Sequence, residues 1–147
     1  MLVLMTLGVS LVSGLVPIVN AELYLLSIGF VAESWWLAII IALAAAIGQM
    51  IAKVGIYLVA RRGAELPKGK LGEKLERYRA RIEMHPASAS AITFASGIVG
   101  LPPLYLVSVA AGLCRTSLVG FALFGTLGRA LRFYAVLVAP SAVMSWL

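Results

Sequence analysis

Two apolar stretches of membrane-spanning length, residues 35–60 and 117–139, constrain this sequence more than any other feature. A helix needs about 20 mainly apolar residues to cross a bilayer. The composition agrees, since 62% of the 147 residues are hydrophobic and 12% are charged, against about half and about a quarter in soluble domains. A soluble enzyme and a disordered chain are therefore disfavoured. The sequence predicts an all-α integral membrane protein, with several passes through the cell (plasma or inner) membrane.

The orientation of the first span follows from its ends. Trp35-Trp36 opens the span and Arg61-Arg62 closes it. Tryptophan gathers at membrane interfaces, and basic residues are retained on the cytoplasmic side. Residues 61–86 also hold eight of the twelve Lys and Arg and four of the six Asp and Glu. We therefore expect this block to be a cytoplasmic loop. Nucleic-acid binding is disfavoured, because the block offers only Tyr78 as a stacking aromatic.

The block at 61–86 carries the pattern of an amphipathic helix. Its apolar residues recur at spacings of four, three and four: Leu71, Leu75, Tyr78 and Ile82. Glu73–Arg77 and Arg79–Glu83 are opposite charges four residues apart on the other faces, a spacing that stabilises helices. The pattern predicts a basic connector helix that lies on the cytoplasmic interface, packs against the bundle, or is simply solvated.

The remaining apolar stretches are too interrupted to be ordinary spans. Gly14, Pro17, Asn20 and Glu22 divide residues 1–34, and Gly97, Gly100 and Pro102-Pro103 divide residues 87–114. Each piece is about half the length of a span, and broken backbone at membrane depth must be buried or line a cavity. We expect two re-entrant helical hairpins within a single membrane domain, and a short tail at 140–147. A cleaved signal peptide is disfavoured, because no basic region precedes the first apolar run.

An internal repeat relates the two halves. Residues 23–29 read LYLLSIG and residues 104–110 read LYLVSVA, at an offset of 81, and each copy follows the break in its half. Ile47-Gly48-Gln49 matches Leu127-Gly128-Arg129 at an offset of 80. With 61–86 on the inside, the halves have opposite orientations, which places Arg115 on the cytoplasmic side. Two inverted repeats, each a re-entrant hairpin plus a transmembrane helix, are a common transporter architecture.

Glu22, Arg129 and Arg132 are the charges most deeply placed in the apolar halves. Ionised groups at membrane depth usually face a cavity or a partner. Glu22 is expected either to cap a helix start or to bind a proton or a cation. Arg129 and Arg132 are expected to bind a phosphate, to pair with Glu22, or to cap hairpin carbonyls. Pro17, Pro102 and Pro103 join this candidate substrate and proton site, because they mark the two breaks.

Other reactive residues carry weaker signals. Lys53 and Arg115 are secondary site candidates, although Lys53 lies close enough to the inner end of its span to extend to the interface. Cys114 is expected to be a small packing residue, and His85 to mark the end of the loop. The sequence offers no nucleophile constellation, phosphate-binding glycine loop or metal-ligand cluster. We therefore predict transport rather than catalysis, with no cofactor and no metal.

Short motifs along both halves resemble the DedA family of membrane proteins, also called the VTT or SNARE-associated family, and most of all its short bacterial branch. The likeness covers nearly the whole chain. The residues that carry it are Pro17, Glu22, Gly48, Gly55-x-Tyr57, Arg61-Arg62-Gly63, Phe94-x-x-Gly97, Pro102-Pro103, Ala111-Gly112, Phe121 and Gly128-Arg129-x-x-Arg132-Phe133.

The resemblance implies two re-entrant hairpins and the flipping or scrambling of a lipid such as undecaprenyl phosphate, often coupled to protons. It also implies that an acid in the first hairpin, here Glu22, takes part. Many members have arginines at the positions of Ile98 and Leu104 and an acid at that of Lys53. We therefore expect Arg129 and Arg132 to take the anion-binding role in this chain.

Three functions fit these observations. The first is a flippase or scramblase whose partners are anionic membrane lipids or lipid phosphates, with protons as the coupling ion. The second is a small proton-coupled multidrug-type exporter that works as a homodimer with Glu22 as its shared acid. The third is a membrane scaffold that transports nothing and recruits a partner through its central helix.

Overall fold

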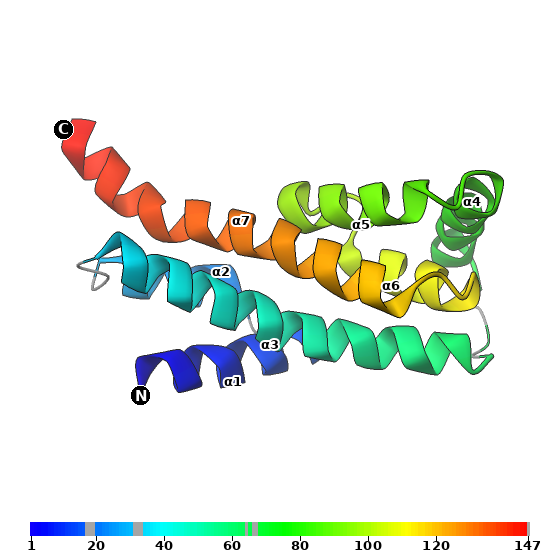
Figure 1. Cartoon of the computed structure of the whole chain (residues 1–147), viewed down its shortest axis with the longest axis horizontal. Helices are drawn as coiled ribbons and strands as arrows, with labels where there is room; N and C mark the ends of the chain where they lie inside the picture. The colour runs from blue at the N-terminus through cyan, green and yellow to red at the C-terminus, as the bar shows by residue number, and fades with distance from the viewer. Residues whose placement is uncertain (17–19, 31–33, 64, 66–67, 147) are drawn as a thin grey trace. The chain divides into compact units, whose positions relative to one another are not determined.

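The computed structural model describes residues 1–16, 20–30, 34–63, 65 and 68–146, with side-chain surroundings up to residue 140. In these ranges the chain forms seven helices and no strand (Figure 1). The helices are α1 (Leu2–Leu15), α2 (Ala21–Gly29), α3 (Trp35–Arg61), α4 (Lys70–Met84), α5 (Ser88–Val99), α6 (Leu104–Leu113) and α7 (Leu118–Trp146). The all-helical prediction is therefore confirmed for the described part of the chain.

The ends of the short helices have local causes. After α1, Val16 is extended (φ −113°, ψ 109°), because a residue that precedes a proline avoids the helical region. The side chain of Asn20 caps α2 by accepting a hydrogen bond from the Glu22 N–H at 2.9 Å. After α5, Gly100 has φ 82°, a left-handed conformation that glycine adopts without steric cost. Pro103 then precedes the first turn of α6.

Two helices are long and apolar enough to cross a membrane, judged by length and composition: α3 over Trp35–Arg61 and α7 over Leu118–Pro140. The second of these spans matches the predicted 117–139, and α7 itself continues over the predicted tail, through Pro140 to Trp146. A proline inside a helix removes one hydrogen bond and crowds the carbonyl four residues earlier.

The chain divides into two compact units. Unit 1 contains residues 1–52 and 129–147, and unit 2 contains residues 53–128. Unit 1 therefore holds α1, α2, the first part of α3 and the last part of α7. Unit 2 holds α4, α5, α6, the last part of α3 and the first part of α7.

The core of unit 1 joins α2, α3 and α7. Small side chains dominate the α3 face, which allows close helix approach. The buried residues of this core are Ala21 and Leu25 of α2, Ala38, Ile41, Ala42, Ala45 and Ala46 of α3, and Phe133 and Leu137 of α7.

The core of unit 2 is built around α4. Leu75 and Ile82, which are 0% and 2% exposed, pack with Leu106 and Ala110 of α6 and with Ala89 of α5. The apolar face that the sequence predicted for α4 is thus covered by protein. Of the three placements considered for this helix, full solvation is excluded, and packing against neighbouring helices is the one observed.

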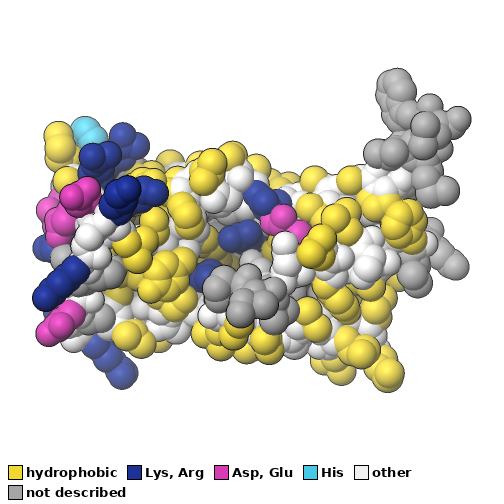
Figure 2. All heavy atoms as spheres, turned by 180° about the vertical axis from the view of Figure 1, so that it is seen from behind, with side chains coloured by type: hydrophobic (Ala, Val, Ile, Leu, Met, Phe, Trp, Pro, Cys, Tyr) yellow, Lys and Arg dark blue, Asp and Glu magenta, His cyan; other side chains and the backbone are white. Residues whose placement is uncertain are grey.

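Several helices bury small or polar residues and expose large apolar ones. The buried residues of α1 are Thr6, Ser10 and Gly14, and those of α5 are Ala89, Thr93, Ser96 and Gly97. Large apolar side chains lie on the outside instead, and Figure 2 shows hydrophobic surface over much of the face it views. The exposed residues on α1 and α3 include Leu4, Met5, Val12, Leu15, Ile40, Leu43, Ile47 and Ile51. Helices of water-soluble proteins show the reverse arrangement, with large apolar side chains toward the core and polar side chains outside.

Two glycines that the repeat aligns allow the same kind of contact. In unit 1, a Cβ added to Gly48 of α3 would lie 2.5 Å from the Leu7 carbonyl oxygen of α1. In unit 2, a Cβ added to Gly128 of α7 would lie 2.6 Å from the Phe94 carbonyl oxygen of α5. Each glycine therefore brings the first short helix of its half against a long helix.

The second short helix of each half, α2 or α6, packs against the other long helix. In unit 1, Gly29 of α2 lies against α7, where an added Cβ would be 2.8 Å from the Leu137 carbonyl oxygen. In unit 2, Gly112 of α6 lies against α3, where an added Cβ would be 2.8 Å from the Ala60 Cβ. Exchanging α1 with α5, α2 with α6 and α3 with α7 converts one set of contacts into the other.

Candidate functional site

An ion pair in unit 1 joins two of the predicted site residues. The Arg132 Nε of α7 donates a hydrogen bond to Glu22 Oε1 of α2 at 2.6 Å. Hydrogen bonds between ionised partners are shorter and stronger than neutral ones. The two side chains are 27% and 32% exposed, respectively. The pair is therefore accessible from outside the protein and is not enclosed in a dry core.

The start of α2 positions the carboxylate of this pair. Asn20 fills the capping position, so the capping role considered for Glu22 belongs to its neighbour. Glu22 follows in the first turn of α2, where a negative charge is favoured by the partial positive charge of the helix terminus. Its side chain is free to extend to α7, because Asn20 already satisfies the backbone N–H.

Arg129 lies one turn before Arg132 on α7. Its Nε is buried and has no hydrogen-bond partner among the described residues. Its guanidinium carbon lies 5.9 Å from the centroid of the Phe133 ring. A buried donor without a partner is unfavourable and calls for an explanation. The site contains two arginines and one carboxylate, so it carries a net charge of +1 and an unused donor, which suits an anionic ligand.

A second polar group of unit 1 was not predicted from the sequence. The Ser13 hydroxyl of α1 accepts hydrogen bonds from the Ala21 N–H and from Gln49 Nε2 of α3, each at 3.2 Å. Ser10 Oγ and Gln49 Oε1 are buried without partners among the described residues. The placement of Gln49 in an apolar span, four residues before Lys53, was the signal available in the sequence.

The other predicted site residues that the structure describes belong to unit 2. Pro17 is outside the described residues. Pro102 and Pro103 form the α5–α6 connection of unit 2, where the Pro102 carbonyl accepts a hydrogen bond from the Ser96 hydroxyl. Lys53 Nζ, also in unit 2, lies 5.9 Å from the centroid of the Tyr105 ring.

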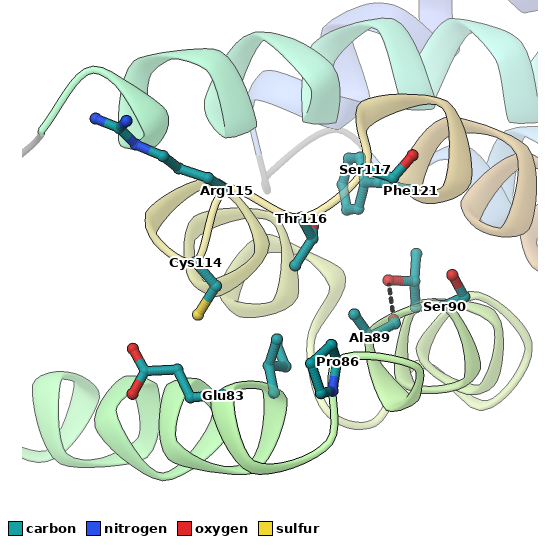
Figure 3. A pocket seen from close by; sticks show the side chains of 11 residues that line it. Glu83, Pro86, Ala89, Ser90, Cys114, Arg115, Thr116, Ser117 and Phe121 are labelled. Carbon is teal, nitrogen blue, oxygen red and sulfur yellow. Dashed lines mark hydrogen bonds between the residues drawn. The ribbon is translucent and has the colours of Figure 1, made fainter.

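Arg115 lies at the turn between α6 and α7, with φ 51°. It belongs to the lining of a cavity of about 380 Å³ in unit 2. Figure 3 shows its guanidinium pointing away from Cys114 and Glu83, whose side chains face each other. Arg115 therefore does not offer its charge to the groups inside this cavity.

Cys114 is partly buried in the same lining, and its thiol lies 3.9 Å from the Arg79 carbonyl oxygen. Burial raises the pKa of the Cys114 thiol, and the negative charge of Glu83 raises it further. The sequence predicted a packing role for this residue. A thiol that resists ionisation is a weak nucleophile, which agrees with that role.

Comparison of the chain with protein-family models, curated proteins and solved structures gives no match. The chemistry of the site is therefore argued from its own residues. Arg129 and Arg132 can hold an anion through charge-assisted hydrogen bonds, and the Glu22–Arg132 pair can open to admit one.

Proposed function

We propose that this protein is a multi-pass membrane protein that moves an anionic lipid or lipid phosphate between the leaflets of the cell membrane. Within the cluster formed by Glu22, Arg129 and Arg132, the two arginines would bind the phosphate. The observation that carries the proposal is the buried, unpartnered Nε of Arg129 beside an accessible ion pair. The net charge of the cluster selects anions over cations.

The distribution of side chains supports a membrane location. α3 and α7 have the length and composition of spans, and α1 and α5 direct small and polar residues inward. Lipid removes the hydrophobic driving force between helices, so helices in membranes associate through small and hydrogen-bonding residues. The basic block at 61–86 would then lie on the cytoplasmic side.

The exchange pattern of helix contacts supports an inverted repeat with two re-entrant hairpins. The glycine contacts of unit 1 and unit 2 are related by exchange of equivalent helices. Transporters built from inverted repeats bind their substrates where broken helices meet. The motif resemblance to the DedA family implies the same architecture and a lipid phosphate of the undecaprenyl type.

Lipid exchange in reconstituted vesicles tests this proposal. Vesicles that contain a fluorescent phosphatidylglycerol would be treated with a membrane-impermeant quencher, and the protein should increase the fraction of label that is quenched with time. Arg129→Gln should slow this exchange on the order of tenfold or more, because a charge-assisted hydrogen bond to phosphate is worth about 1.5–3 kcal/mol. Arg62→Gln, the same charge change at an exposed position outside the site, should leave it unchanged.

The outcome separates the competing functions. Exchange no faster than in protein-free vesicles would remove the translocation proposal. A cation efflux that is abolished by Glu22→Gln while lipid exchange is absent would favour a proton-coupled exporter instead.

A further inference from the structure

A second concave site lies in unit 2, where α4 passes the connection between α5 and α6. Three basic side chains of α4, those of Lys74, Arg77 and Arg81, line a cavity of about 390 Å³ together with Tyr78 and residues 101–103. The bases are three and four residues apart, so they share one face of the helix. The volume falls within the range of about 300–1,000 Å³ typical of small-molecule sites.

The acidic residues of α4 do not neutralise this face. Arg79 pairs with both Glu76 and Glu83, at 3.9 and 2.9 Å. The Glu73–Arg77 pair expected from the sequence is not formed in the described part of the chain. The lining described for the cavity therefore contains three positive charges and no carboxylate. Figure 2 shows basic and acidic side chains together at the end of the molecule that holds α4.

The opposite wall of the cavity is apolar and exposed. Leu101 is 70% exposed and Pro103 is exposed beside it. Neither residue is covered by another described part of unit 2. A free inorganic anion would use the three cations but would gain nothing from this wall. A lipid headgroup uses both, since its phosphate needs cations and its acyl chains need an apolar surface next to them.

We propose that this cavity, which we call the α4 headgroup site, binds the phosphate of an anionic membrane lipid. Lys74, Arg77 and Arg81 hold the phosphate oxygens, and the acyl chains lie along Leu101 and Pro103. The inference rests on the membrane location proposed above, but it does not require translocation. It assigns a function to Pro103, a predicted site residue that the Glu22 cluster leaves without one.

Binding to the protein purified in a neutral detergent tests the site without transport. Dihexanoyl phosphatidic acid would be titrated by calorimetry at about 0.15 M salt, where screening over about 8 Å suppresses distant charges. Lys74→Gln/Arg77→Gln/Arg81→Gln should weaken binding on the order of a hundredfold, at about fivefold per basic residue. Arg77→Gln alone, an exposed change that spares the fold, should weaken it about fivefold.

The matched control carries the same loss of three charges outside the cavity. Arg62→Gln/Lys68→Gln/Lys70→Gln should change the affinity by less than about threefold, because these residues are exposed and do not line the site. Equal weakening by both triple variants would overturn the proposal, since it would reduce the effect to overall charge.

A change in the apolar wall distinguishes binding of a lipid phosphate from binding of free inorganic phosphate. Leu101→Ser should weaken phosphatidic acid and leave inorganic phosphate unaffected, and dihexanoyl phosphatidylcholine should bind far more weakly than phosphatidic acid. Inorganic phosphate that binds as tightly as phosphatidic acid would overturn the assignment to a lipid. Lipid binding lost in the cavity variant while vesicle exchange persists would separate this site from the proposed translocation. Unaltered protein that binds phosphatidic acid and gives no vesicle exchange would remove the proposed translocation alone.

Discussion

Gly48 provides the sharpest test of the helix packing in unit 1. An alanine Cβ at this position would lie 2.5 Å from the Leu7 carbonyl oxygen and 3.2 Å from both the Leu11 nitrogen and the Ser10 Cβ. Two of these three neighbours are backbone atoms of α1, so relief requires the whole helix to move. We therefore expect Gly48→Ala to force α1 away from α3.

The size of the effect follows from two opposing terms. Overpacking typically costs about 1–3 kcal/mol, whereas replacing a helical glycine by alanine gains about 0.5–1 kcal/mol. Gly48→Ala should therefore lower the free energy of unfolding by up to about 2.5 kcal/mol. Gly55 lies on the same helix with no atom within 4 Å of an added Cβ. Gly55→Ala should be stabilising by about 0.5–1 kcal/mol.

Unfolding in mixed micelles with increasing sodium dodecyl sulfate, followed by helical circular dichroism, measures both changes. Gly128→Ala is expected to behave like Gly48→Ala, because its added Cβ meets the α5 backbone at 2.6 Å. Equal stability changes for Gly48→Ala and Gly55→Ala would refute the packing argument. A destabilised Gly48→Ala with an unaffected Gly128→Ala would refute the equivalence of the two halves.

Three further predictions concern other contacts. Replacing Glu22 or Arg132 with glutamine should each cost about 1–3 kcal/mol of unfolding free energy, and the double replacement less than the sum. Leu75→Ala should cost about 2–5 kcal/mol in the same measurement, because this side chain is 0% exposed. Alkylation of Cys114 should accelerate with pH only above the range of an ordinary thiol, since its pKa is raised, and Glu83→Gln should shift the profile downward.

Each of these predictions has an outcome that contradicts it. Additive single and double replacements would mean that the ion pair contributes no coupling. A small loss at Leu75 would mean that α4 does not pack on α6. Alkylation with the pH profile of a free thiol, unchanged by Glu83→Gln, would mean that Cys114 is neither buried nor near that carboxylate.

Local chemistry made the helices predictable. The apolar lengths of residues 35–60 and 117–139 anticipated α3 and the start of α7, and the glycines and prolines marked the breaks between the short helices. The continuation of α7 beyond Pro140 was missed, because a proline more often ends a helix than lies inside one. The apolar face of α4 was visible from its spacing, but its covering partner was not.

Contacts between residues far apart in the chain were harder to predict from the sequence. The sequence identified Glu22, Arg129 and Arg132 as unusual, since charges are expensive in apolar segments. It left open whether Glu22 would cap a helix or meet an arginine, and Asn20 decided that question by taking the capping position. The α4 headgroup site was missed, because the expected Glu73–Arg77 pair hid the fact that Arg77 faces the α5–α6 connection.

The sequence by itself determined that this chain is helical, where its helices break and which charges are exceptional, because these properties depend on periodicity, backbone restriction and composition over short distances. Only the tertiary structure decided that Arg132 pairs with Glu22, that the Nε of Arg129 is left without a partner, and that the bases of α4 lie beside Pro102 and Pro103. Those outcomes depend on how helices far apart in the chain approach each other. For the Glu22–Arg132 pair, α2 approaches α7 closely at Gly29, where an added Cβ would lie 2.8 Å from the Leu137 carbonyl oxygen.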